Sequence, residues 1–548
     1  MIKSIDPSAC TGCGTCTKTC PLDVFRLNTD RQEMSPCMHA CPAGVDIRTN
    51  HYLIQQGRLA EAVENYRRRQ PFPAITGRVC FHPCEGACAR RTVDEAVNIN
   101  AVERFLGDYA LEMPVTVPPV RHITKVAVVG SGPAGLSCAY FLNQMGYPVT
   151  VFEAMPRAGG MLRYGIPAYR LPDELLDAHI QALEEAGVTF RCNTSIGQGG
   201  DLTLDELQKT GFKAIMLAPG ASRARHLDIP GIDSKRVFWG LDFLRAVRCG
   251  ESLPAAGRVI VIGGGDVAVD AAITARRLGS QDVSIVSLED REHLPAYPHN
   301  QKDASRQGID FLCGWGPESL TDNDQNATIV FRRCLSVTDE NGRFAPVFGD
   351  ETMSLDADML IFAIGQYSDL APFENVVETS RGRIVTDAVT GASSVWGVFA
   401  AGDAATGPAS VAAAIGGGRE CADSIDRMLK GADLTGERDR PRPVLPEEAL
   451  PGKGVRKEIR HEVTLLDTDP EAPFAESSRG LDMEAGFAEA LRCMTCGSTA
   501  RIAYTDDCMT CFNCEINCPS EAIYVHPFKE RFARTLDQVE VISETGSK

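Results

Sequence analysis

Two stretches of the chain repeat one order of elements, an apolar strand, a glycine-rich turn and a helix, and this order constrains the fold most. Val126–Val129 lead into Gly-x-Gly-x-x-Gly, and Val259–Ile262 lead into Gly-x-Gly-x-x-Ala. The glycines allow a tight turn and let the backbone approach a pyrophosphate, whose charge the helix N-terminus faces. The two turns supply the candidate nucleotide-binding residues Gly130, Gly132, Pro133, Ala134, Gly135, Gly263, Gly265, Asp266 and Val267.

Each stretch continues into a second apolar strand that ends in an acid. Glu153 follows Val149–Phe152, and Glu289 follows Val283–Leu288. A carboxylate at this place accepts hydrogen bonds from a ribose hydroxyl. The complete order predicts an α/β fold of doubly wound sheets with two dinucleotide sites, which suits a flavin together with a nicotinamide.

Cysteine is the second unusual feature, because fifteen of the 21 cysteines form tight groups at the two ends of the chain. A disulfide framework is a poor explanation for a large chain that starts without a signal peptide, and spacings of two or three residues favour metal or cluster ligation. Cys10–Cys20 and Cys508–Cys518 both follow the bacterial ferredoxin spacing, in which three cysteines bind one cubane and the fourth binds its neighbour. A structural zinc is the alternative, but it seldom uses such a run.

The two ferredoxin motifs lie at opposite ends of the chain, whereas a two-cluster ferredoxin has both within one short domain. We therefore expect the termini to meet and to build one split ferredoxin. One [4Fe-4S] cluster is then expected on Cys10, Cys13, Cys16 and Cys518, and the other on Cys20, Cys508, Cys511 and Cys514.

Three further elements, Leu217–Ala221, Ala363–Gln366 and Gly397–Asp403, accompany the two turns. Together they resemble the two-dinucleotide flavoproteins, in which the first site holds FAD and the second, inserted site holds NAD(P)H. Gly159–Pro167 narrows the resemblance to the glutamate synthase small-subunit family, over roughly residues 35–430. The resemblance implies cofactor contacts for Gly160, Arg163, Gly365, Gly402 and Asp403, the last near the ribityl chain and pyrophosphate of the flavin.

The same resemblance gives the remaining cysteine groups a role. The family has a helical two-cluster domain in which a Cys-x2-Cys pair precedes the element that is Cys37-x3-Cys41 here; this pair is missing from its usual place, and Cys493-x2-Cys496 matches it. We infer that the C-terminal arm folds back to supply it. The expected ligand sets are Cys37, Cys88, Cys493 and Cys496 for one cluster, and Cys41, Cys80, Cys84 and Glu103 for the other, which makes four [4Fe-4S] clusters in all.

The residue after the second strand of a nucleotide unit separates NAD from NADP, because a carboxylate repels a 2′-phosphate that arginine would bind. NADP-using members of the resembling family typically carry paired arginines here, whereas this chain has Leu288-Glu289-Asp290. The sequence therefore predicts NADH. Arg291 and the Arg276-Arg277 pair leave NADPH as the alternative, and Asn300 stands where the family usually has an acid.

The motifs divide the chain into domains. We expect a ferredoxin-like domain from residues 1–30 and 481–548, a helical [4Fe-4S] domain from 31–118, an FAD domain from 123–255 and 371–430, an NAD(P)H domain from 256–370, and a linker at 431–480.

Charge and cysteine placement exclude several functions. The net charge of -18 argues against nucleic acid or an anionic membrane surface as a partner. No apolar run approaches the roughly 20 residues of a membrane span, so a cytoplasmic location is expected. Disulfide reductases share the flavoprotein core, but they need two closely spaced cysteines beside the flavin. The middle of the chain has only the isolated Cys138, Cys192, Cys249, Cys313, Cys334 and Cys421.

These features predict a FAD-dependent NADH oxidoreductase subunit that passes electrons between NAD(H) and [4Fe-4S] clusters, for delivery to or from a partner redox enzyme or ferredoxin. Three alternatives stay open. They are a glutamate synthase small subunit that serves a glutamine amidotransferase partner, a flavin-based electron-bifurcating subunit, and a cluster-bearing scaffold with vestigial nucleotide sites. The sequence assigns no catalytic residue.

Overall fold

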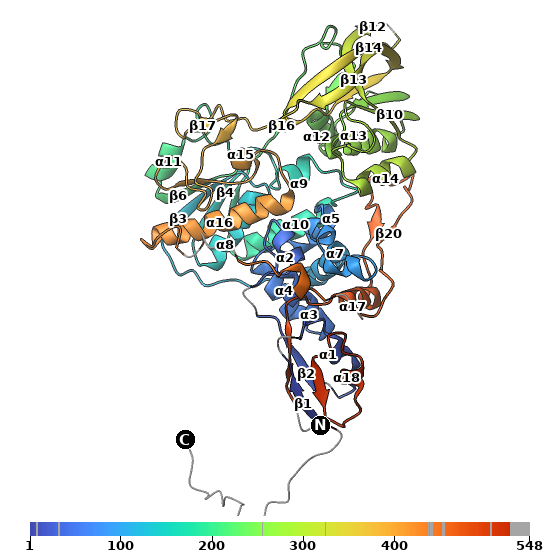
Figure 1. Ribbon diagram of the computed structural model, residues 1–548. Coiled ribbons are helices and arrows are strands. Elements are labelled where there is room, and N and C mark those ends of the chain that lie inside the picture. Colours follow the sequence, from blue (N-terminus) through green and yellow to red (C-terminus); the bar gives the residue numbers. More distant parts are fainter. Residues whose placement is uncertain are drawn as a thin grey trace, which may run out of the picture.

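The structure is a computed structural model, and Figure 1 shows two α/β lobes above a layer of helices, with a small domain below. It describes residues 1–6, 9–22, 24–30, 33–254, 256–323, 325–436, 438, 442–451, 455–504 and 507–526. Within these residues, no helix is both long and apolar enough to span a bilayer.

The first lobe contains a five-stranded parallel sheet in the order β19-β6-β3-β4-β5. Its strands are nearly all apolar, as expected for a sheet buried on both faces by helices. The sheet consists of β3 (Lys125–Val129), β4 (Val149–Phe152), β5 (Thr189–Arg191), β6 (Phe212–Leu217) and β19 (Val398–Ala400). Its helices are α8 (Pro133–Gln144), α9 (Met161–Tyr164), α10 (Asp173–Glu185), α11 (Leu204–Lys209), α15 (Asp403–Thr406) and α16 (Val411–Leu429).

The second lobe contains a parallel sheet in the order β11-β10-β9-β15-β8 and an antiparallel sheet in the order β12-β13-β14. The strands of the parallel sheet are β8 (Val237–Trp239), β9 (Arg258–Ile262), β10 (Asp282–Ser287), β11 (Asp310–Cys313) and β15 (Met359–Phe362). The antiparallel strands are β12 (Trp315–Asp322), β13 (Ala327–Thr338) and β14 (Phe344–Ala357). The helices are α12 (Gly240–Arg248), α13 (Asp266–Arg277) and α14 (Pro298–Arg306).

The structure differs from the expected boundary at residue 255, because β8 pairs with β15 and so belongs to the sheet of the second lobe. This three-residue strand carries no glycine turn of its own, so only its pairing assigns it. Two short antiparallel ladders lie outside these sheets. Strand β7 (Arg223–Ala224) pairs with β16 (Gln366–Tyr367), and β17 (Thr379–Ser380) pairs with β18 (Arg383–Ile384).

The helical layer lies beneath both lobes (Figure 1). It is made from α2 (Pro36–Ala40), α3 (Ile47–Gln55), α4 (Leu59–Arg67), α5 (Pro73–Val79), α6 (Pro83–Gly86), the 3-10 turn η1 (Ala89–Thr92), α7 (Ile99–Leu111) and α17 (Met483–Arg492). Helices α5 and α7 cross closely because both carry glycine at the crossing. A Cβ atom on Gly77 would overlap the backbone of Arg104, and one on Gly107 would overlap the backbone of Ala74.

The small domain, which we call the ferredoxin-like end, is built from both ends of the chain. Strand β1 (Ile2–Ile5) pairs antiparallel with β23 (Ile523–Val525), and β2 (Phe25–Asn28) pairs antiparallel with β22 (Thr499–Ile502). The short helices α1 (Thr15–Thr19) and α18 (Asn513–Ile516) pack against these ladders. The two ferredoxin motifs therefore share one core.

The segment expected as a linker runs along the helical layer as an extended strap. It contains the 3-10 turn η2 (Glu447–Ala449), and β20 (Thr464–Leu465) pairs with β21 (Ser478–Arg479). Near its start, the amide of Leu445 donates to the carbonyl of Met34 at 2.9 Å; near its end, the amide of Ser477 donates to the carbonyl of Tyr169 at 2.9 Å. The strap thus contacts the helical layer and the first lobe in turn.

Candidate functional site

The first glycine turn has a conformation that only glycine allows. Gly130 has φ +97°, and a Cβ atom there would overlap the carbonyl oxygen of Ala218 on the neighbouring strand. Gly132 caps α8, and a Cβ atom there would meet no other atom within 4 Å. The turn is therefore tight on its sheet side and open on the other side, where the N-terminus of α8 begins.

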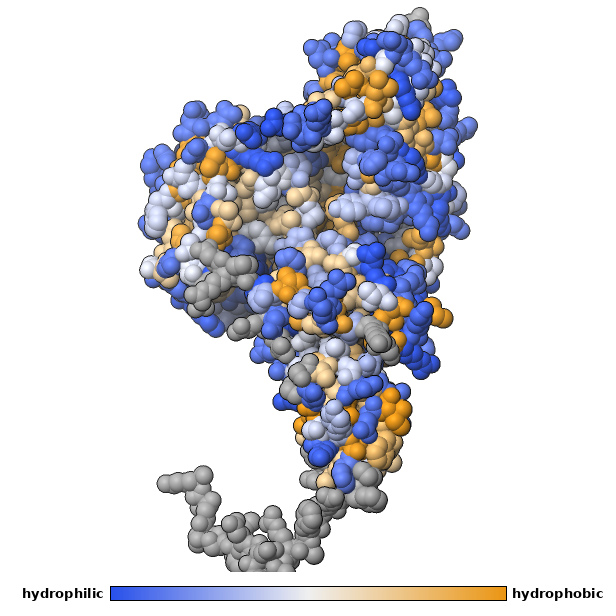
Figure 2. All heavy atoms as spheres, in the orientation of Figure 1, coloured by the Kyte–Doolittle hydropathy of each residue, from blue (hydrophilic) through white to orange (hydrophobic). Residues whose placement is uncertain are grey.

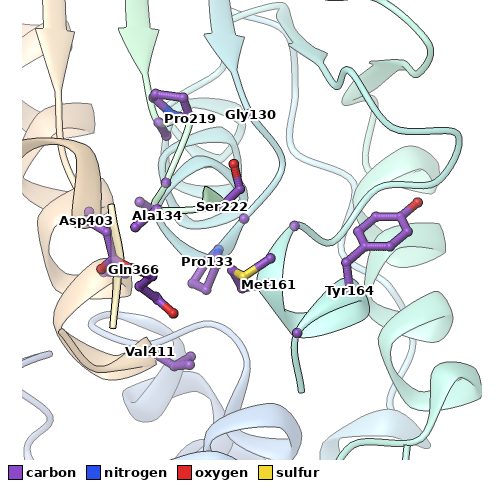
Figure 3. Close-up of a pocket in the computed structure, with 18 of the residues that line it drawn as sticks. Gly130, Pro133, Ala134, Met161, Tyr164, Pro219, Ser222, Gln366, Asp403 and Val411 are labelled. Carbon is purple, nitrogen blue, oxygen red and sulfur yellow. The ribbon is translucent and has the colours of Figure 1, made fainter. Parts of the chain in front are cut away.

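The open side of the turn faces a cavity of about 680 Å³. Figure 2 shows the hollow between the two lobes, and Figure 3 shows Pro133, Met161, Asp403 and Val411 arranged around this space. A cavity of this size, with backbone and apolar walls, fits a large cofactor. The predicted residues on its wall are Gly130, Gly132, Pro133, Ala134, Glu153, Gly160, Gly402 and Asp403 from the first lobe, and Asp266 and Val267 from the second.

Two carboxylates on the cavity wall are held by backbone amides. Glu153 is 7% exposed, and its carboxylate accepts hydrogen bonds from the amides of Ser131 at 3.0 Å and Met155 at 2.9 Å. Asp403 accepts from the amide of Ala409 at 3.2 Å, and burial raises the pKa of its carboxyl. Backbone amides therefore hold both acids in place.

Other predicted cofactor residues lie behind the wall. Gly135 lets α8 pack on the turn, since a Cβ atom there would overlap the carbonyl of Gly130. The buried Arg163 donates to the carbonyl of Ala158 at 2.6 Å and to Asp177. It therefore braces the Gly159–Gly160 loop. Gly365, at φ +113°, lies beside the side chain of Arg225.

The second turn repeats the construction of the first. Gly263 has φ +140°, and a Cβ atom there would overlap the carbonyl of Ala363; Gly265 caps α13 and has no neighbour within 4 Å of a Cβ position. Glu289 lies beside this turn, with its Oε2 atom 2.7 Å from a Cβ position on Gly264. The acid at the end of β10 thus lies next to the glycine turn that it follows in sequence.

The arginines near the second turn contact groups other than Glu289. Arg276 donates to the carbonyls of Ser280 and Gln281, both at 2.8 Å, and Arg277 donates to the carbonyl of Pro473 at 2.9 Å. The guanidinium of Arg291 lies over the ring of Phe311, 3.9 Å from its centroid. These contacts direct the arginines away from Glu289.

A polar network that the sequence did not predict joins the two lobes at the cavity. Asn300 accepts from Arg170 at 2.8 Å and donates to Asp266 at 2.7 Å, and Arg170 also contacts the half-buried Asp270. Burial raises the pKa of Asp270, while Arg170 opposes that change. The i, i+4 spacing of Asp266 and Asp270 on α13 was the only signal in the sequence, because Arg170 lies 100 residues from Asp270.

The predicted cluster ligands gather in four places. Small cavities are lined by Cys37, Cys88, Cys493 and Cys496, by Cys41, Cys80, Cys84 and Glu103, and by Cys20, Cys508, Cys511 and Cys514. For the fourth group, burial raises the pKa of Cys16, and the neighbouring Cys13, Cys10 and Cys518 raise it further. The structure therefore brings together the members of each predicted set.

In the described part of the chain, no three His, Cys, Asp or Glu side chains converge as ligands of one metal ion do. The predicted cluster ligands instead lie around small cavities.

Glu103 lies in a pocket that controls its carboxylate. Its Oε1 atom accepts from Gln70 at 2.9 Å and from the hydroxyl of Thr76. Burial raises the pKa of Glu103 to about 7, and the hydrogen bonds from Thr76, Gln70 and Tyr66 oppose that shift. A bound metal centre would hold such a carboxylate ionised, so Glu103 suits the role of a cluster ligand. Gln70, Thr76 and Tyr66 were not predicted from the sequence.

The sites form a continuous series. Cys80 lines both the nucleotide cavity and its own cluster cavity, and Ile47 and Ile99 line both cluster cavities of the helical layer. The hydroxyl of Thr495 donates to the carbonyl of Gly12 at 2.7 Å. This hydrogen bond joins the loop of Cys493 and Cys496 to the ferredoxin-like end.

Comparisons with known proteins match the N-terminal ferredoxin motif, the helical layer and the two lobes. The profile of the pyridine nucleotide-disulphide oxidoreductase family matches residues 124–418. The profile of dihydropyrimidine dehydrogenase domain II with its 4Fe-4S cluster matches residues 31–115, and that of the 4Fe-4S binding domain matches residues 3–26.

None of the six isolated cysteines, all of which are described, lines the nucleotide cavity.

Three curated relatives have similar sequences. The beta subunit of the NADP(+)-dependent formate dehydrogenase of Moorella thermoacetica is 35% identical over 84% of this chain and 70% of its own length. The NAD-dependent dihydropyrimidine dehydrogenase subunit PreT of Escherichia coli is 34% identical over 73% and 92%. The glutamate synthase [NADPH] small chain of Azospirillum brasilense is 33% identical over 72% and 86%. The chain belongs to the pyridine nucleotide-disulphide oxidoreductase family and, with its 4Fe-4S domains, is an NAD(P)H-dependent flavin and iron–sulfur oxidoreductase.

Proposed function

We propose that this chain is the NADH-reacting subunit of a larger redox complex, and that it exchanges electrons between NAD(H) and a partner redox protein by way of FAD and four [4Fe-4S] clusters. The observation that carries the proposal is the position of Cys80, which lies on the wall of both the nucleotide cavity and a cluster cavity. Relatives that are themselves named as subunits, of a formate dehydrogenase and of a dihydropyrimidine dehydrogenase, support the idea of a partner.

The first turn and the N-terminus of α8 would bind the flavin pyrophosphate, with Asp403 near the ribityl chain and Glu153 at the adenosine ribose. A bound flavin accepts a hydride from a nicotinamide and releases electrons singly, and iron–sulfur clusters accept them singly. Asp266 and Val267 bring the second lobe to the same cavity. This position supports nicotinamide binding against the flavin.

The environment of Glu289 supports NADH as the nucleotide. Its carboxylate lies beside the second turn, where an adenosine ribose would bind, and would repel a 2′-phosphate. The neighbouring Arg276 and Arg277 hold backbone carbonyls instead. The names of the relatives include both NADP(+) and NAD, so the choice rests on this chain's own residues.

The partner would dock at the ferredoxin-like end. Cys511 is exposed, and Leu22 and Met509, which line the same cavity, are 43% and 61% exposed. Figure 2 shows apolar side chains on this end of the molecule. Exposed apolar side chains beside a proposed cluster site support docking of another protein there.

A direct test is the cofactor content of protein purified without oxygen. We expect about sixteen iron and sixteen acid-labile sulfide per chain, together with one FAD, if four cubanes form. NADH should then reduce a viologen dye. About eight iron would show that two of the ligand sets are wrong, and flavin that NADH fails to reduce would favour the scaffold alternative.

A further inference from the structure

The two cluster sites of the helical layer differ in the charged side chains that line them. Arg48 and Arg90 line the cavity of the Cys37 set and are 1% and 2% exposed. Arg48 donates to the carbonyl of Cys496 at 3.3 Å, and Arg90 donates to the carbonyl of Arg492 at 2.8 Å. Lys18 approaches the same loop and donates to the carbonyls of Leu491 and Cys493. Cations therefore border this site directly.

The acids that pair with Arg90 and Arg492 do not line the cavity. Arg90 pairs with Asp94 at 2.7 Å, and Arg492 pairs with Glu489 at 2.7 Å and with Asp94 at 2.9 Å. Neither Asp94 nor Glu489 is among the residues that line the cavity. Because Coulomb energy falls with distance, the nearer guanidinium groups dominate the potential at the cluster position.

The site of the Cys41 set lies in a different environment. Glu103, a proposed ligand that takes the place of a thiolate, lines its cavity, and the buried Glu85 follows Cys84 in sequence but does not line the cavity. As far as the described residues show, no arginine or lysine lines this cavity. Arg460 pairs with Glu85 at 2.9 Å and offsets one of the two acids.

We propose that the buried arginines make the cluster held by Cys37, Cys88, Cys493 and Cys496 easier to reduce than the cluster held by Cys41, Cys80, Cys84 and Glu103. Reduction adds a negative charge, which nearby cations stabilise and nearby acids destabilise, and cluster potentials follow local charge. The site beside the flavin cavity then has the lower potential, and the site that contacts the ferredoxin-like end has the higher one. This order rests on the ligand sets of the proposed function and favours electron flow from the flavin towards the partner.

The test is a redox titration of the full-length, anaerobically prepared protein, followed by electron paramagnetic resonance. Signals are assigned to the two sites by their loss in Cys88→Ser and Cys84→Ser. Arg48→Gln should lower the midpoint potential of the Cys88 signal by about 59 mV. For a one-electron couple, this shift corresponds to about a tenfold lower ratio of reduced to oxidised cluster at a fixed potential. Arg48→Lys keeps the charge and should leave the potential close to that of the wild type.

Glu85→Gln is the reciprocal variant and should raise the potential of the Cys84 signal. It keeps the test decisive if Arg48→Gln disturbs the Cys496 loop and loses its cluster. Unchanged potentials in Arg48→Gln or in Glu85→Gln, or a Cys84 signal that is reduced first in the wild type, would overturn the inference. About sixteen iron in the same samples would leave the proposed function intact, whereas missing signals in the wild type would instead contradict the ligand sets.

Discussion

Glu289 is a single side chain on which the choice of nucleotide depends. A hydrogen bond to a charged group contributes roughly 1.5–3 kcal/mol, and about 1.4 kcal/mol corresponds to a tenfold change in affinity. Glu289→Arg should therefore weaken NADH binding about tenfold or more, and it should strengthen NADPH binding because it replaces repulsion with attraction. Rates of flavin reduction by each nucleotide measure this. Asp290→Ala, a change at the adjacent exposed acid that pairs with His293, is the control. Equal rates with NADH and NADPH in the wild type would contradict the assignment.

Glu103 is the one predicted cluster ligand that is not a cysteine. Glu103→Ala should remove about four of the iron atoms per chain, because the cubane of Cys41, Cys80 and Cys84 loses its fourth ligand. It should also destabilise the apoprotein, since Thr76 and Gln70 lose their acceptor inside the fold. Iron analysis and thermal unfolding measure the two effects. Glu64→Ala, on the exposed face of α4, should change neither. Full iron content in Glu103→Ala would assign the fourth ligand elsewhere.

At the scale of elements, the crossing of α5 and α7 positions Glu103 opposite Thr76. Gly107→Val should force these helices apart, because the new side chain would overlap Ala74. Overpacking of this kind costs about 1–3 kcal/mol, and we expect a lower melting temperature and loss of iron from the helical layer. Gly86→Ala is the matched control, since nothing lies within 4 Å of its Cβ position. A Gly107→Val protein with wild-type stability would show that the two helices do not pack as described.

Short-range patterns predicted the elements that carry the nucleotide turns. The expected strands Val149–Phe152 and Val259–Ile262 correspond to β4 and to β9 within one residue, because apolar runs and glycine turns are local signals. The long hairpin of β12 to β14 was not predicted, and neither were the contacts of the strap. Their exposed, mixed residues depend on pairing between distant segments. The network of Arg170, Asp270 and Asn300 was missed for the same reason, since it forms only when the lobes meet.

The whole molecule connects its two ends through one row of sites. Shared wall residues connect the nucleotide cavity to the two cavities of the helical layer, and Figure 1 shows the ferredoxin-like end below that layer. Cysteine spacing and the family resemblance led to the proposed ligand sets, but not to the order of the sites. That order depends on shared wall residues such as Cys80 and Ile99. The C-terminal arm contributes cysteines to a cavity of the helical layer as well as to the ferredoxin-like end.

Removal of the C-terminal arm tests this organisation. Deletion after Pro470 should leave about four of sixteen iron atoms, because only the Cys41 set has all its ligands in the remaining chain. Both parallel sheets close within β3 to β19, before the deletion, so FAD should still bind and NADH should still bleach it. Electron delivery to one-electron acceptors should fall sharply.

The deletion also removes Ser477, which donates to Tyr169, so a second variant is needed to separate loss of ligands from loss of the strap. Cys493→Ser combined with Cys496→Ser keeps the strap and removes one ligand pair. Because cluster binding is coupled to folding, this variant should lose about four iron atoms from the Cys37 set and keep the Cys41 set. The matched change Cys138→Ser, at a buried cysteine of the first lobe, should keep all of them. If the paired variant retains sixteen iron, the arm does not complete the helical layer, and the ligand set of Cys37 and Cys88 must be sought elsewhere in the chain.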